Sequence, residues 1–139
     1  MIARCGLILM LSLAGAWPHS SQDAPPKGEA EEERSRVAGV WRGHSECTVK
    51  NSPCHDEVNV YRFSKIAGRE NAFSVTASKV VDGKEVVMGN SEWKYDEKKQ
   101  VLECDRPSIQ MAIHGGKMEG ALRLKDGTVY RRIYLKKES

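Results

Sequence analysis

Residues 72–87 read AFSVTASKVVDGKEVV, and this stretch decides the class of fold. Phe73 and Val75 alternate with polar residues, which is the period-2 pattern of a strand with one buried face. Asp82-Gly83 ends the first run and favours a tight hairpin turn of the primed type, with positive φ at both residues. The stretch therefore predicts two antiparallel strands in a sheet that has one buried and one wet face.

The same pattern continues on both sides of this hairpin, from residue 38 to the end of the sequence. Short apolar and β-branched runs are separated by turn signals, of which Asp126-Gly127 also favours a tight primed turn. Every connection is too short for a crossover helix, so neighbouring strands should pair antiparallel. Eight strands are expected, at Gly39–Cys47, Glu57–Lys65, Ala72–Val81, Glu85–Tyr95, Gln100–Cys104, Ser108–His114, Met118–Leu124 and Val129–Lys136.

The number of strands bears on the architecture. An open sheet of this size, with no helix to cover it, would leave two edges unpaired, and closure into a barrel removes both. We therefore expect an all-β domain over residues 38–139, a single eight-stranded antiparallel up-and-down barrel. A two-sheet β-sandwich is the alternative, because the same strand signals would support it.

The N-terminal part differs in character from the rest. Arg4, the uncharged apolar run 7–14 and the small residues up to Ala16 are typical of a secretory signal peptide, which we place at 1–16. Residues 17–37 are polar and acidic and offer nothing apolar to pack, so we expect a flexible linker there. The signal predicts export, to the periplasm or out of the cell.

Composition excludes two classes of protein. With 40% hydrophobic and 29% charged residues and a mean hydropathy of -0.54, the mature protein is not expected to be embedded in a membrane. The 22 basic and 19 acidic residues of the full sequence alternate in sign, as at 94–99, whereas nucleic-acid binding needs a clustered basic stripe. We therefore expect no nucleic-acid partner.

Three cysteines lie beyond the predicted signal. In an exported chain Cys47 and Cys54, which flank a turn at 51–53, are expected to form a disulfide across the first loop between strands. Cys104 is then unpaired, and a buried, inert thiol is favoured for it. A disulfide from Cys104 to either of the other two is the alternative.

Metal binding is suggested by residue type alone. His44, Cys47, Cys54 and His55 are all residues that bind zinc. Their spacing does not match that of structural zinc sites, where cysteines lie two to four residues apart, and an oxidising compartment favours the disulfide. We expect neither a metal nor a cofactor.

Catalytic residue types are present but scattered. Ser45 lies between His44 and Glu46, yet successive residues of a strand point to opposite faces, so the three would not converge. His114 adjoins a glycine turn and is expected to be exposed. The sequence therefore predicts no catalytic residues and a protein that is not an enzyme.

The two ends of the domain resemble a known group of barrels. Gly39-Val40-Trp41 opens the first expected strand and is similar to the G-x-W signature of lipocalin-like (calycin-type) proteins. The resemblance implies that Trp41 closes the lower end of the barrel and that a basic residue of the last strand, Arg131, stacks over its ring. A guanidinium over an indole stabilises by about 0.5–2 kcal/mol. A shift of one residue would exchange Arg131 for Arg132.

Two functions follow as hypotheses. The first is an exported, non-enzymatic binding module, because barrel mouths commonly hold binding sites. Its unknown ligand would be a small apolar molecule or an envelope or extracellular protein. The alternative is a protein-interaction or enzyme-inhibitor barrel that acts through its N-terminal tail and loops, including the cross-linked loop from Cys47 to Cys54.

Overall fold

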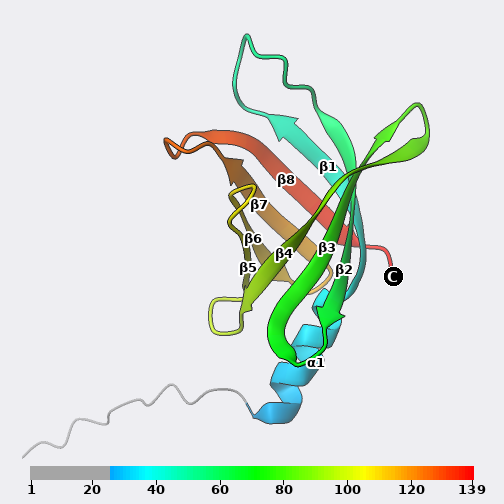
Figure 1. Ribbon diagram of the computed structural model, residues 1–139, viewed down its shortest axis with the longest axis vertical. Coiled ribbons are helices and arrows are strands. Elements are labelled where there is room, and N and C mark those ends of the chain that lie inside the picture. Colours follow the sequence, from blue (N-terminus) through cyan, green and yellow to red (C-terminus); the bar gives the residue numbers. More distant parts are fainter. Residues whose placement is uncertain (1–25) are drawn as a thin grey trace, which may run out of the picture.

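A computed structural model describes residues 26–139, which form one helix followed by a closed barrel (Figure 1). Each strand pairs antiparallel with the next, and the last strand returns to pair with the first. The prediction of an all-β, eight-stranded up-and-down barrel is confirmed, and the two-sheet sandwich is excluded. The elements are α1 (Lys27–Val37), β1 (Gly39–Cys47), β2 (Glu57–Ile66), β3 (Arg69–Val81), β4 (Lys84–Asp96), β5 (Val101–Cys104), β6 (Ile109–His114), β7 (Lys117–Arg123) and β8 (Val129–Lys137).

One of the two predicted primed turns is correct. Asp82 and Gly83 have φ values of 50° and 77°, as the primed turn requires. At Asp126-Gly127 the prediction is wrong, because only Gly127 has a positive φ, of 87°. There the Asp126 carboxylate accepts the Thr128 N–H at 2.9 Å, and this local hydrogen bond holds a longer loop between β7 and β8.

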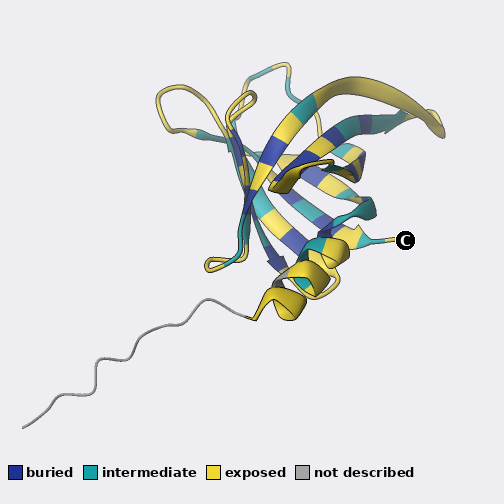
Figure 2. Cartoon of the chain, turned by 60° about the horizontal axis from the view of Figure 1, so that its bottom comes forward, coloured by how far each residue is buried: buried dark blue, intermediate teal, exposed yellow. Residues whose placement is uncertain are grey.

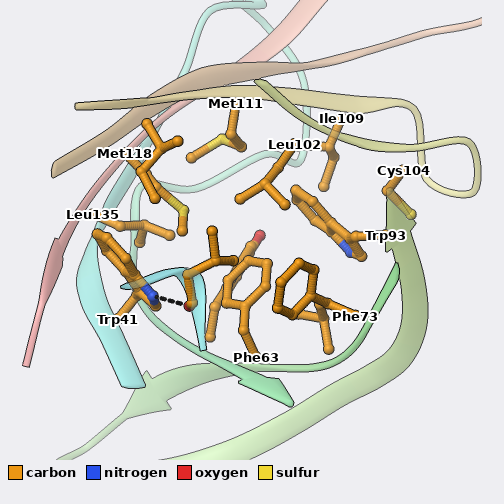
Figure 3. Close-up of a cluster of buried hydrophobic side chains, with 14 of the residues drawn as sticks. Trp41, Phe63, Phe73, Trp93, Leu102, Cys104, Ile109, Met111, Met118 and Leu135 are labelled. Atoms are coloured by element: carbon orange, nitrogen blue, oxygen red, sulfur yellow. Dashed lines mark hydrogen bonds between the residues drawn. The ribbon is translucent and has the colours of Figure 1, made fainter. Parts of the chain in front are cut away.

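The core runs from Ile109, beside the turn between β5 and β6, to Trp41 at the end of the barrel nearest α1 (Figure 3). Inward-facing positions there carry large rings and sulfur or branched chains, and adjacent rings meet edge to face, as Phe63 does with Phe73 and Trp93. These side chains fill the interior and leave the barrel solid at this end. The largest fully buried side chains of the described residues include Trp41, Phe73, Trp93, Leu102, Met111, Met118, Ile133 and Leu135.

Helix α1 covers this filled end of the barrel (Figures 1 and 2). Val37, the last residue of α1, is fully buried within the core. The Val37 carbonyl accepts a hydrogen bond of 2.9 Å from the Trp41 indole N–H. The prediction of a flexible linker over 17–37 is therefore wrong for residues 27–37, which form a helix that places Val37 in the core.

Polar contacts hold the remainder of α1 against the barrel. Arg34 forms an ion pair with Glu97 in the turn after β4. Glu33 accepts hydrogen bonds from the Tyr95 hydroxyl at 3.4 Å and from the Gln100 amide at 3.2 Å. Burial, together with the charge of Glu33, raises the pKa of Tyr95 to about 12. Glu33, one of the acidic residues that suggested a linker, thus accepts hydrogen bonds from side chains at the rim of the barrel.

The predicted signal peptide at 1–16 and the beginning of the predicted linker lie outside the described residues. Between Pro26 and Ser139, no helix is long and apolar enough to cross a membrane.

Two glycines of β1 allow the close approach of β8 and of Ser139, which follows β8. Gly39 has a φ of 127°, and a Cβ atom there would lie 2.1 Å from the Ser139 carbonyl oxygen. A Cβ atom on Gly43 would lie 1.8 Å from the carbonyl oxygen of Tyr134. Both contacts are with backbone atoms, so the strands would have to separate to admit any side chain.

Candidate ligand-binding site

The barrel end opposite α1 is open and contains a cavity of about 220 Å³. Seven strands and the turn between β5 and β6 contribute to its wall. Short side chains line it on β1, β3 and β4, where Ser45, Ala77, Gly89 and Ser91 face it. The cavity exists because these residues are too small to fill the space that aromatic rings occupy at the other end of the same strands.

The deep part of the cavity is apolar and aromatic. Tyr61 and Trp93 meet there edge to face, with ring centroids 6.0 Å apart. Ile109, Leu122 and Ile133 complete this surface from β6, β7 and β8. An apolar group could therefore pack against this surface, and an aromatic ring could stack on, or meet edge to face, the rings of Tyr61 and Trp93.

One wall of the cavity is polar and consists of Ser45, Glu57, Asn59 and Arg131. One guanidinium nitrogen of Arg131 donates to the Ser45 hydroxyl at 3.0 Å and to the His55 carbonyl at 2.7 Å. The other nitrogen lies 3.5 Å from a carboxylate oxygen of Glu57. The side chains of Arg131 and Glu57 are only 14% and 20% exposed. This pair places one positive and one negative group in a setting where water screens them weakly.

Asn59 extends the polar wall beside Glu57. Its amide nitrogen donates to Glu57 at 3.4 Å, which leaves the amide oxygen pointing the other way. That oxygen is buried and has no hydrogen-bond partner among the described residues. Burial, with the nearby Glu57 charge second, raises the pKa of Tyr61 to about 12, so its hydroxyl stays protonated at neutral pH. The polar wall thus contains a hydroxyl that keeps its proton and a buried amide oxygen that could accept a hydrogen bond.

The residues predicted to close the barrel lie at opposite ends of it. Gly39 and Trp41 lie at the end that α1 covers, whereas Arg131 lies at the open end. The prediction that Arg131 stacks over Trp41 is wrong: Trp41 pairs with Lys137, whose ammonium lies 5.8 Å from the ring centroid. Six residues of extended strand, about 20 Å, separate the two β8 positions.

The choice between the two adjacent arginines is settled by which face each occupies. Arg131 lines the cavity, whereas Arg132 is exposed on the outer wall. Lys137, the residue that does lie over Trp41, is partly buried, and this burial lowers the pKa of its ammonium. The alternation along β8 thus identifies Arg131 as the arginine that faces the interior. It does not predict which residue of β8 lies over Trp41.

The predicted disulfide between Cys47 and Cys54 is confirmed. It braces the loop between β1 and β2 at the rim of the cavity, where the Cys47 N–H also donates to Asp56 at 2.8 Å. Cys104 is a buried free thiol, as favoured, and its sulfur lies 3.5 Å from the Arg106 carbonyl oxygen. The alternative disulfides to Cys104 are excluded.

The structure does not bring the three histidines of the described chain together. His44 stacks on Tyr134 on the outer wall, with ring centroids 5.2 Å apart. His55 follows the cross-linked loop at the open end, and His114 is exposed at the end of β6, nearest α1. From residue 26 onward no group of three or more His, Cys, Asp or Glu side chains could hold a metal ion. The zinc ligands considered from the sequence are divided between a disulfide and two separate surfaces.

Sequence reasoning missed Glu57, Asn59 and Tyr61 as site residues. All three lie on β2 and line the cavity. Their alternate spacing continues to buried Phe63, which could have marked them as facing the interior. The sequence signal for the site is therefore an acid and an amide at the inward-facing positions of one predicted strand.

Comparisons with known proteins bear on the fold alone. Neither the scan against protein-family models nor the search of curated proteins finds a match. Among solved structures, the chain is similar to a redesigned β-barrel with a TM-score of 0.56 and 11% sequence identity. The alignment covers 77% of this chain and 96% of that barrel. At this identity the likeness supports the barrel architecture and nothing about a ligand.

Proposed function

We propose that this protein is a binding module that takes a small, mostly apolar molecule with a polar end group into the cavity at the open end of the barrel. The observation that carries the proposal is the cavity itself, with an apolar, aromatic interior and one polar wall built around Arg131 and Glu57. Binding sites commonly combine a concave apolar surface with a few placed polar groups.

The volume bounds the size of the ligand. A dry apolar cavity of about 150 Å³ in another protein accommodates benzene. At about 220 Å³, the present cavity has room for a single ring with a short substituent. Larger molecules, such as long acyl chains or steroids, would have to extend beyond the barrel mouth.

The polar wall bounds the chemistry of the end group. Arg131 offers hydrogen-bond donors and Glu57 offers acceptors, and their charges cancel. A neutral group that both accepts and donates, such as a carboxamide, suits this pair better than a carboxylate, which Glu57 would repel. The ring would then lie toward Tyr61 and Trp93.

The proposed role is binding rather than catalysis. The Tyr61 hydroxyl has a pKa near 12, far from the value that suits proton transfer at neutral pH. The Arg131 guanidinium offers only hydrogen-bond donors and no acceptor. These groups are suited to hold a polar ligand in one orientation.

We also propose that the protein is exported, as the N-terminal sequence predicts. The Cys47–Cys54 bond supports this, because disulfides form and persist mainly in oxidising compartments.

An NMR titration with defined probes tests the proposed ligand class. Benzamide should shift the backbone amide signals of Tyr61, Trp93 and Arg131 and bind more tightly than toluene or benzoate. Arg131→Met should weaken benzamide binding by about tenfold, since a hydrogen bond to a charged group contributes about 1.5–3 kcal/mol.

Arg132→Met is the matched control for this titration. It removes the same charge from the adjacent residue, which faces the outer wall. It should leave benzamide binding unchanged. If none of the three probes shifts cavity residues, or if both arginine variants weaken benzamide equally, the proposal fails.

A further inference from the structure

Strand β4 is paired along only one edge over most of its length. On one side its residues pair with β3 from Lys84 to Lys94. On the other side only Lys94, Tyr95 and Asp96 pair with β5. Within residues 26–139 no further backbone hydrogen bond joins that second edge to another segment between 84 and 93. The β3–β4 hairpin accordingly flares away from the barrel (Figure 1).

This free edge borders the cavity at the open end. Gly89, Ser91 and Trp93 line the cavity from β4, and Arg106 and Pro107 line it from the turn between β5 and β6. In the described part of the chain no backbone hydrogen bond joins these two parts of the wall, so the backbone of the wall is interrupted there. The stretch 89–93 is a regular strand, because its pairing with β3 is continuous and the one bulge precedes it.

Gly89 differs from the other strand glycines of residues 26–139. A Cβ atom on Gly39, Gly43 or Gly120 would lie 2.1, 1.8 or 1.9 Å from a backbone oxygen of another segment, so these positions require glycine. At Gly89 no atom beyond its chain neighbours lies within 4 Å of the Cβ position, and its φ is not positive. A glycine inside a strand often marks a place where a ligand or another backbone approaches closely. Gly89 fits this case, since nothing in the described chain requires a glycine there.

We propose that the free edge of β4 binds an extended peptide segment of another protein. The segment adds a strand beside Gly89–Trp93 and places a tyrosine side chain in the cavity. This inference rests on the proposed function, because it identifies the ring with a polar end group as a side chain of a peptide.

The backbone of β4 favours a peptide over a free small molecule. A free strand edge carries a row of unpaired N–H and C=O groups, and an extended backbone has the matching row of acceptors and donors. A small molecule inside the cavity would leave this row unpaired. A peptide strand pairs with the row and also closes the interruption in the cavity wall.

The cavity favours tyrosine among the side chains that such a peptide could place there. Neighbouring residues on paired strands share a face of the sheet, so the peptide residue beside Gly89 points into the cavity. Its ring would lie toward Tyr61 and Trp93, in a space of about 220 Å³. Its hydroxyl can accept from Arg131 and donate to the Asn59 amide oxygen, which is buried without a partner among the described residues.

Calorimetric titration of the protein with acetyl-Thr-Thr-Tyr-Thr-Thr-amide tests the proposal. The peptide should bind at least about tenfold more tightly than p-cresol, which is its side chain alone, because backbone pairing adds hydrogen bonds. The peptide with alanine in place of tyrosine should show no measurable binding, because it leaves the cavity unfilled.

Two N-methylated forms of this peptide separate backbone pairing from binding of the side chain. One form is methylated on its second and fourth residues, and the other on its first, third and fifth. Successive N–H groups of a strand point to opposite sides, so only one form loses the groups that face β4. That form should bind at least about tenfold more weakly than the parent peptide, and the other should bind like the parent.

A substitution at Gly89 tests the place of the side chain. Gly89→Leu fills the space beside the tyrosine without a clash in the free protein, and it should weaken peptide binding by about tenfold or more. Asn90→Leu is the matched control, because the Asn90 side chain lies on the outer face, where it accepts a hydrogen bond of 2.7 Å from Thr76. It should leave peptide binding unchanged. Far-ultraviolet circular dichroism reports whether both variants are folded.

The outcomes distinguish this proposal from the proposed function. If p-cresol and benzamide bind but the peptide binds no more tightly than p-cresol, or if the two methylated forms bind equally, the peptide proposal fails and binding in the cavity stands. If no probe binds, both proposals fail. An equal effect of the two leucine variants would overturn the peptide proposal alone, as would sedimentation equilibrium showing a second copy of this chain that excludes the peptide.

Discussion

The two ends of the barrel differ although the same strands run through both. At the end that α1 covers, β1, β2 and β3 contribute Trp41, Phe63 and Phe73, all buried. At the open end the inward positions of these strands are Ser45, Asn59 and Ala77, and a cavity remains. Strand pairing thus fixes the barrel, while side-chain volume along each strand decides where it is solid and where a cavity remains.

The largest expected effect is a loss of stability caused by a substitution at the solid end of the barrel. Trp41→Ala removes a fully buried ring and its hydrogen bond to Val37, and it should lower the free energy of unfolding by about 3–5 kcal/mol. Leu122→Ala at the open end should lower it by less than about 2 kcal/mol, because Leu122 already borders a cavity and is only partly buried. Urea unfolding measures both, and equal losses would contradict the difference between the two ends.

A smaller loss should follow from removing the disulfide at the open end. Replacing both Cys47 and Cys54 by serine releases a short loop and should lower the free energy of unfolding by about 2.5 kcal/mol in the chain-entropy model. It should also weaken benzamide binding, because Arg131 donates to the His55 carbonyl at the edge of this loop. Reduction of the wild-type protein is the control and should reproduce both changes, whereas unchanged stability after reduction would contradict the prediction.

The smallest expected effect is a pH dependence at the boundary between the two ends. Tyr61 has a pKa of about 12 in the folded protein, raised from 10.0 chiefly by burial. Between these two values the folded state keeps the proton that the unfolded state loses, so stability should fall as the pH rises from 10 to 12. Each pKa unit of difference corresponds to about 1.4 kcal/mol, so at pH 11, midway between the two values, the loss should be about 1.4 kcal/mol, less than the loss expected for the disulfide.

Tyr61→Phe isolates this contribution. The variant should show a shallower fall above pH 10, with Tyr95 accounting for part of what remains because burial raises its pKa to about 12 as well. Below pH 10 the two proteins should have parallel stability profiles. An equally steep alkaline fall in the variant would show that Tyr61 is not the group responsible.

The barrel could be predicted because its signals are local and repeated. Alternation marks the inward face, and paired turn residues such as Asp82-Gly83 fix neighbours, so strand order follows from the chain itself. The largest error in a strand boundary is at β3, which begins at Arg69 rather than Ala72. The disulfide was predictable for the same reason, because its cysteines flank one short loop.

The helix and the site could not be predicted in the same way because they depend on contacts between distant segments. The polarity of α1 suggested a linker, and only the complete barrel shows a place for Val37 and partners such as Glu97. Arg131 faces the interior as its parity indicates, but the pairing register between β1 and β8 decides that it lies far from Trp41. The cavity likewise depends on the combined volume of side chains from many strands, so no single sequence motif predicts it.

The proposed binding mode requires a small ligand with a polar end group to enter the open end, while the covered end is closed to it. Intermolecular nuclear Overhauser effects between benzamide and the isotope-labelled protein test it most directly. Binding at the open end should give contacts from the probe ring to the Trp93 ring and the Ile133 methyl groups, and none to Val37 or Leu135. Contacts to the residues beneath α1, or their absence throughout at saturating probe, would contradict it.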